Sequence, residues 1–140
     1  MLVSPTDTPT TIHSVVNLAS VLTPPLALIA AEIDYTPAGL ATASVLRLTA
    51  CVGGGTLSGL AAPAQGQLLL VCNISTDPID KIVLLHEDGG SLAANRFLIG
   101  PSLVYDAVDP TDTVSFTIPP AGSVWLWYDL DSARWRKVGA

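Results

Sequence analysis

The sequence predicts an all-β fold, an antiparallel β-sandwich of the jelly-roll kind that follows an extended N-terminal arm. Short runs rich in leucine and β-branched residues succeed one another from Ile12 onward. Clusters of proline, glycine and aspartate separate those runs and provide frequent turn signals. At Thr113–Ile118 apolar and polar residues alternate strictly, which is typical of a strand with one buried face.

The length and composition of the chain predict one domain. The chain has 140 residues, of which 49% are hydrophobic and 13% charged, so it can bury a sizeable core. Residues 1–11 contain two prolines and four threonines without any apolar period, and we expect them to form the extended arm. Residues 12–140 are then expected to form a single β-sandwich domain.

The strands expected before the C-terminal hairpin can be taken in chain order. Leu26–Tyr35 alternates like a strand, although a short helix behind the two prolines at 24 and 25 fits the same residues. The run of glycines at Gly53–Gly59 is expected to be a flexible connection, and Ser91–Asn95 one helical turn. Besides Thr113–Ile118, further strands are expected at Ser44–Val52, Gln67–Ile74, Lys81–Glu87 and Leu103–Val108.

The C-terminal hairpin provides the candidate contact residues. Strands Ser123–Asp129 and Arg134–Val138 flank the turn Leu130–Ala133. Alternation places Val124, Leu126 and Tyr128 on one face of the first strand and the two tryptophans on the other. One of these two faces must point into the core. If Val124, Leu126 and Tyr128 point inward with Trp135, the outward side chains and candidate partner contacts are Trp125, Trp127, Arg134 and Arg136.

The charge and hydropathy patterns exclude two classes of partner. The formal net charge is -6, whereas binding to a phosphate backbone needs clustered Lys and Arg, so nucleic acid is not expected. The longest apolar runs, Leu26–Ala31 and Leu68–Cys72, are far too short to span a membrane. The first basic residue is Arg47, so the N-terminus lacks the positive region of a secretory signal, and we expect the chain to stay where it is made.

No catalytic, cofactor or metal site is expected, and the chain is not expected to be an enzyme. Only His13 and His86 could act as an imidazole base, and neither belongs to a nucleophile motif. Neither His86–Asp88 nor the aspartates at 106, 109 and 112 follow the ligand spacing of a zinc or calcium site. The glycine run lacks the Lys-Ser/Thr of a phosphate loop. Cys51 and Cys72 are expected as buried free thiols.

Four motifs occur in order from about Ala64 to the end of the chain: N-I-S-T, L-L-H-E-D-G-G-S-L-A-A-N-R-F, T-I-P-P-A-G-S-V-W-L-W-Y-D and A-R-W-R. With these motifs, this part of the chain resembles a β-rich module of tailed-bacteriophage virion surface proteins, including tail-fibre segments and capsid decoration or cement proteins. In that module the intervening positions of V-x-L-x-Y are commonly polar, whereas here they are Trp125 and Trp127. The matching positions are Asn73, Ile74, His86, Glu87, Asn95, Arg96, Phe97, Ile118, Pro119, Pro120, Gly122, Ser123, Val124, Leu126, Tyr128, Asp129, Arg134, Trp135 and Arg136.

The resemblance implies a structural role on a virion. We expect a protein that binds the outer surface of an assembled phage capsid and cements it by bridging neighbouring shell subunits. Its partners would be the major capsid protein and other copies of itself, with a dimer as the default and a trimer as the rival. It would be made in the host cytoplasm and end on the capsid surface. The alternative is a carbohydrate- or receptor-binding β-sandwich module of a tail fibre.

Overall fold

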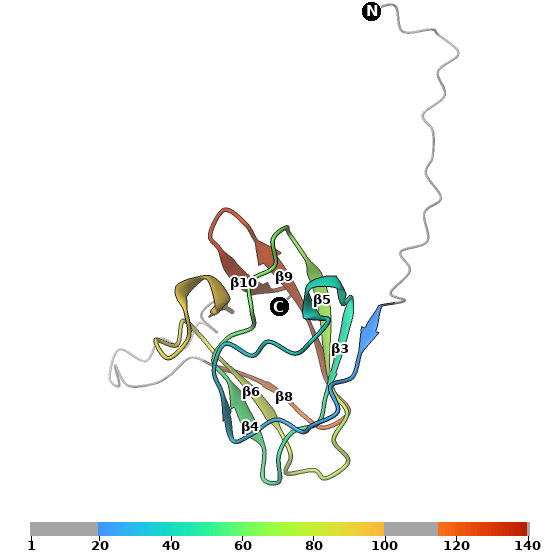
Figure 1. Ribbon diagram of the computed structural model, residues 1–140. Coiled ribbons are helices and arrows are strands. Elements are labelled where there is room, and N and C mark those ends of the chain that lie inside the picture. The colour runs from blue at the N-terminus through green and yellow to red at the C-terminus, as the bar shows by residue number, and fades with distance from the viewer. Residues whose placement is uncertain (1–19, 100–114, 140) are drawn as a thin grey trace, which may run out of the picture.

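The hydrophobic core lies between two β-sheets in the computed structural model, which describes residues 20–99 and 115–139 (Figure 1). The six-stranded sheet has the order β1-β3-β5-β9-β10-β7, and the four-stranded sheet has the order β2-β4-β6-β8. Two 3-10 helices, η1 (Leu40–Thr42) and η2 (Ala93–Asn95), lie in the connections. The strands are β1 (Val21–Leu22), β2 (Ala31–Glu32), β3 (Val45–Leu48), β4 (Gly55–Leu57), β5 (Leu68–Asn73), β6 (Ile82–Leu85), β7 (Phe97–Leu98), β8 (Ser115–Ile118), β9 (Ser123–Asp129) and β10 (Arg134–Lys137).

The first six strands wind around the core, because each strand lies in the opposite sheet from the one before it. Val21, Val45 and Leu70 are neighbours in the six-stranded sheet, so successive turns of the winding are 24 and 25 residues long. Ala31, Thr56 and Val83 are the corresponding neighbours in the four-stranded sheet. The chain therefore runs in the same direction each time it re-enters a sheet, and the strand pairs within the winding are parallel.

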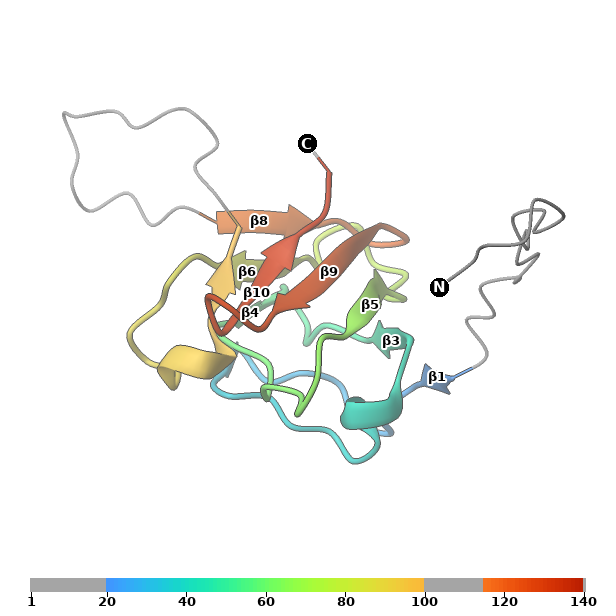
Figure 2. The same ribbon diagram turned by 90° about the horizontal axis from the view of Figure 1, so that it is seen from above.

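The remaining strands close the two sheets. Strand β9 pairs antiparallel with β5 and with β10, and β8 pairs antiparallel with β6. Strand β7 lies parallel to β10 at the edge of the six-stranded sheet. Figure 2 shows β1, β3, β5, β9 and β10 following one another across this sheet.

The prediction of an antiparallel, jelly-roll-like sandwich is wrong, because both sheets are mixed. Parallel pairing holds together β1, β3 and β5 in one sheet and β2, β4 and β6 in the other. Alternation of apolar and polar residues shows which face of a strand is buried, but it carries no information on the direction of the neighbouring strand. That direction is set by the connections, which here cross to the other sheet before they return.

Several predicted elements differ from those in the structure. The glycine run holds the buried strand β4, so it is not merely a flexible connection. Within Leu26–Tyr35 the structure has neither a helix nor a long strand, only the two residues of β2. The helical turn expected at Ser91–Asn95 is the 3-10 helix η2. The extended arm at residues 1–11, the strand expected at Leu103–Val108 and the aspartates at 106, 109 and 112 lie outside the described residues.

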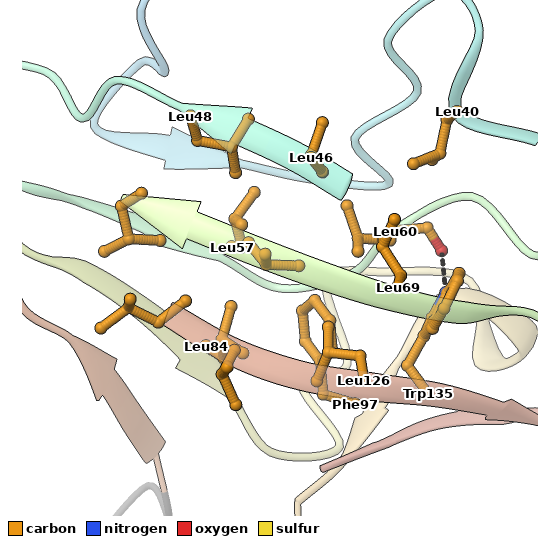
Figure 3. Close-up of a cluster of buried hydrophobic side chains, with 14 of the residues drawn as sticks. Leu40, Leu46, Leu48, Leu57, Leu60, Leu69, Leu84, Phe97, Leu126 and Trp135 are labelled. Carbon is orange, nitrogen blue, oxygen red and sulfur yellow. Dashed lines mark hydrogen bonds between the residues drawn. The ribbon is translucent and has the colours of Figure 1, made fainter. Parts of the chain in front are cut away.

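Alternate residues of β3, β5, β6 and β9 form much of the core (Figure 3). Leu46 and Leu48 of β3 and Leu69 of β5 face Leu57 and Leu84 of the other sheet, and all five are almost completely buried. At one end of this layer, the Asn73 amide nitrogen donates to the carbonyl oxygens of Asp80 and Ile118. The core thereby fixes which side chains of each sheet point away from it.

The described ranges contain no helix that is long and apolar enough to cross a membrane.

Candidate interaction face

The outward side of the six-stranded sheet is determined by alternation along β9. Val124, Leu126 and Tyr128 are buried and pack in the core, as the sequence analysis expected. Trp135 of β10 is completely buried, and its ring meets that of Tyr128 edge to face at 5.2 Å between centroids. Trp125 and Trp127 therefore project from the opposite side of the sheet, where the side chain of Trp127 is 45% exposed.

Strand register places aliphatic side chains next to both tryptophans. Trp125 lies opposite Leu70, which in turn lies opposite Val45, and Val45 lies opposite Val21. Trp127 lies opposite Leu68, whose side chain is 47% exposed. These residues form a contiguous apolar surface across four neighbouring strands, which we call the outer face: Val21, Val45, Leu68, Leu70, Trp125 and Trp127.

The arginines predicted to flank the tryptophans have different roles. Arg136 lies opposite Trp127 in the register, and its Nε is 2.7 Å from Oδ2 of Asp129. Hydrogen bonds from the Ser132 hydroxyl and from Arg136 hold the pKa of the Asp129 carboxyl below its ordinary value. Arg134 instead pairs with Glu87, with 2.6 Å between Nε and Oε1, and the hydrogen bond to Glu87 raises the pKa of Arg134. Of the four predicted contacts, the structure brings Trp125, Trp127 and Arg136 together.

Sequence reasoning missed the aliphatic part of the outer face and one basic residue beside it. Arg47 of β3 is exposed and lies opposite Cys72, which lies opposite Ser123 of β9. No acidic residue within the described ranges forms an ion pair with Arg47. Alternation within each strand could have marked Arg47 and Leu68 as outward residues. Only the pairing of strands far apart in the sequence brings them beside the tryptophans.

The candidate metal and thiol residues have ordinary structural surroundings. Nδ1 of His86 accepts a hydrogen bond from the backbone N–H of Ile99 at 3.2 Å, and Glu87 pairs with Arg134. Over the described ranges, no three His, Cys, Asp or Glu side chains are grouped closely enough to hold a metal ion. Cys51 and Cys72 are both free, but the prediction that they are buried is wrong, since both are partly exposed. Burial raises the pKa of the Cys72 thiol, and the charge of Arg47 partly opposes this.

Comparisons with known proteins identify no relative of this chain: no family model, no curated protein and no solved structure matches it. The fold and the face therefore define the class of protein on their own. It is a two-sheet, strand-rich protein with an apolar outer face that carries two tryptophans and is bordered by arginines.

Proposed function

We propose that the chain is a structural virion protein that binds the outer surface of an assembled phage capsid and bridges neighbouring shell subunits. The observation that carries this proposal is the outer face, where Trp125 and Trp127 lie among aliphatic side chains. The resemblance of the sequence from about Ala64 onward to phage virion surface proteins supplies the biological setting. A protein that binds the assembled shell but not its separate subunits stabilises the shell by its binding free energy.

The composition of the outer face suits contact with another protein. Contiguous exposed apolar surface on a small protein commonly marks an interaction site. Tryptophan and arginine are the residues most enriched among those that dominate binding energy. Arg136 is already paired with Asp129, whereas Arg47 forms no ion pair among the described residues, so the favoured partner surface is apolar with a carboxylate beside Arg47. The proposed partners are the major capsid protein and, within a symmetric oligomer, further copies of this chain.

The first test is the number of copies of this chain per particle. Quantitative mass spectrometry of purified particles should give a ratio to the major shell protein of one, or a simple fraction of one. A few copies per particle would contradict a decoration lattice and favour the tail-fibre alternative. Absence from purified particles would contradict both.

A second test locates the contact. The double variant Trp125→Ala/Trp127→Ala should keep its β-sheet circular dichroism and lose most of its binding to particles that lack the protein, measured by co-sedimentation. A matched control, Val52→Ala/Leu92→Ala, removes two exposed aliphatic side chains outside the outer face and should bind like the wild type. Equal binding of both double variants would show that the outer face is not the contact.

The tail-fibre alternative rests on one specific observation. The exposed ring of Trp127 could stack on a sugar as readily as on a protein side chain. Under that alternative, cell-surface polysaccharide would quench tryptophan fluorescence of the wild type, and Trp127→Ala would abolish the change. Under the capsid proposal, polysaccharide leaves the fluorescence unchanged.

A further inference from the structure

A second apolar site lies in the segment that joins the first strands of the two sheets. A pocket of about 300 Å³ is lined mainly by apolar side chains, among them Pro24, Pro25, Leu26 and Pro37. Tyr35 contributes the aromatic ring of the lining, and Glu32 contributes its carboxylate. None of the outer-face tryptophans takes part, so the pocket is a separate feature of the molecule.

Exposed aliphatic side chains extend beyond this pocket. Leu26 is 79% exposed and Ile29 is 62% exposed, although both line the pocket. Ile33 is also exposed and follows directly after β2, the edge strand of the four-stranded sheet. A small molecule that filled the pocket would leave Ile33 in water. An extended peptide alongside β2 would cover the pocket and Ile33 together, in the manner of strand addition at a sheet edge.

The charge of the pocket indicates what such a peptide carries. Glu32 is half-buried, and its Oε1 accepts a hydrogen bond from the backbone N–H of Ile29 at 3.1 Å. Burial raises the pKa of Tyr35, and the negative charge of Glu32 raises it further. None of the six Lys and Arg residues of the chain lines the pocket. The two ion pairs found among the described residues involve Glu87 and Asp129, not Glu32. A carboxylate in an apolar pocket is best matched by a cation from a partner.

We propose that this pocket binds an extended peptide segment of another protein, with an apolar side chain in the pocket and a lysine or arginine beside Glu32. The chain's own residues 1–19 and 100–114 contain no Lys or Arg, so their sequence does not supply this match. The inference does not rest on the outer face. If both are correct, the protein has two separate contacts, as a bridge between neighbouring subunits needs.

The test uses the full chain and an array of acetylated heptapeptides. Three apolar residues alternate in each peptide with lysine, glutamine or glutamate. Binding should decrease in the order lysine, glutamine, glutamate. Glu32→Gln, which keeps the size of the side chain, should weaken binding of the lysine peptides about fivefold and leave the glutamine peptides unchanged. Asp131→Asn removes an exposed carboxylate elsewhere and is the matched charge control.

Two further variants distinguish the outcomes. Leu26→Ser alters an exposed lining residue and should weaken binding of all apolar peptides, whereas Trp125→Ala/Trp127→Ala should bind them like the wild type. The proposal is overturned if no peptide binds, or if Glu32→Gln binds the lysine peptides as tightly as the wild type. It is also overturned if analytical ultracentrifugation shows self-association that Leu26→Ser abolishes, because the pocket would then hold a second copy.

Discussion

The indole N–H of Trp135 donates a hydrogen bond to the backbone carbonyl oxygen of Leu60 at 3.0 Å, inside the core (Figure 3). Trp135 belongs to β10 of the six-stranded sheet. Leu60 follows β4 of the other sheet and forms a bridge there with Tyr35. Both residues are completely buried, so this bond ties the two sheets together where no water can replace it.

Trp135→Phe should destabilise the protein by about 2 to 4 kcal/mol. The substitution leaves the Leu60 carbonyl oxygen without its donor and also leaves a small cavity. Equilibrium unfolding in urea, followed by circular dichroism, measures the change. Trp127→Phe, in a side chain that is nearly half exposed, should change the free energy of unfolding by less than about 0.5 kcal/mol. Equal effects of the two substitutions would contradict the packing described for Trp135.

The neighbouring glycines 53 and 54 allow a matched comparison of backbone strain and space. Both have positive φ, 84° and 92°, but a Cβ on Gly53 would meet nothing within 4 Å. A Cβ on Gly54 would lie 2.7 Å from the carbonyl oxygen of Lys81, which accepts the backbone hydrogen bond of Gly55 at the start of β4. Gly53→Ala should therefore cost about 1 kcal/mol of stability, from strain alone.

Gly54→Ala should cost at least about 1 kcal/mol more than Gly53→Ala, because either β4 or the Lys81 backbone has to move. Thermal unfolding of the two variants under identical conditions gives the difference directly. If both variants melt at the same temperature, the close approach of Gly54 to Lys81 does not constrain the fold.

The sequence could predict which residues of the best strands are buried, but not how the strands are connected. Alternation at Val124–Tyr128 correctly placed the tryptophans outward, because the period of a strand is a local property. The parallel winding was missed since it depends on pairs such as Val45 and Leu70, which are far apart along the chain. Alternation over Leu26–Tyr35 predicted a strand, but only the two residues of β2 pair there, because the length of a strand depends on its neighbours and not on its own period alone.

The candidate site follows the same division. Trp125 and Trp127 could be identified because they lie on one strand. Val21, Val45 and Leu68 join them only through the register of three other strands, which no local pattern encodes. The pocket beside Glu32 was missed for a different reason, since the segment around it has almost no regular secondary structure and its exposure is set by the fold as a whole.

The thiol of Cys72 can report on occupancy of the outer face. Cys72 lies on the outward side of β5, opposite Arg47. Cys51 lies just before the glycine run at Gly53–Gly59, and its Sγ is 2.8 Å from the carbonyl oxygen of Gly54. If the proposed contact is correct, particle binding should slow alkylation of Cys72 by a maleimide at least about tenfold and leave the rate at Cys51 unchanged. Mass spectrometry of peptides from bound and free protein measures both rates. Equal protection of the two thiols would contradict a contact confined to the outer face.

The Asp129 carboxyl should titrate below its ordinary pKa of 3.8, because the Ser132 hydroxyl, Arg136 and the Asp131 N–H all donate to it. The folded state therefore holds its proton less tightly than the unfolded state. The resulting stabilisation is present above about pH 3.8 and is lost as the pH falls through the lower folded value.

Ser132→Ala removes the strongest of these donors and should raise the pKa of Asp129 toward 3.8. Carbon-13 NMR titration of the carboxyl group measures the shift, and Ser123→Ala, at the other end of β9, should leave it unchanged. An unaltered midpoint in Ser132→Ala would show that the hydroxyl does not hold the carboxylate. In that case the hydrogen bonds from Arg136 and from the Asp131 N–H would account for the lowered pKa of Asp129.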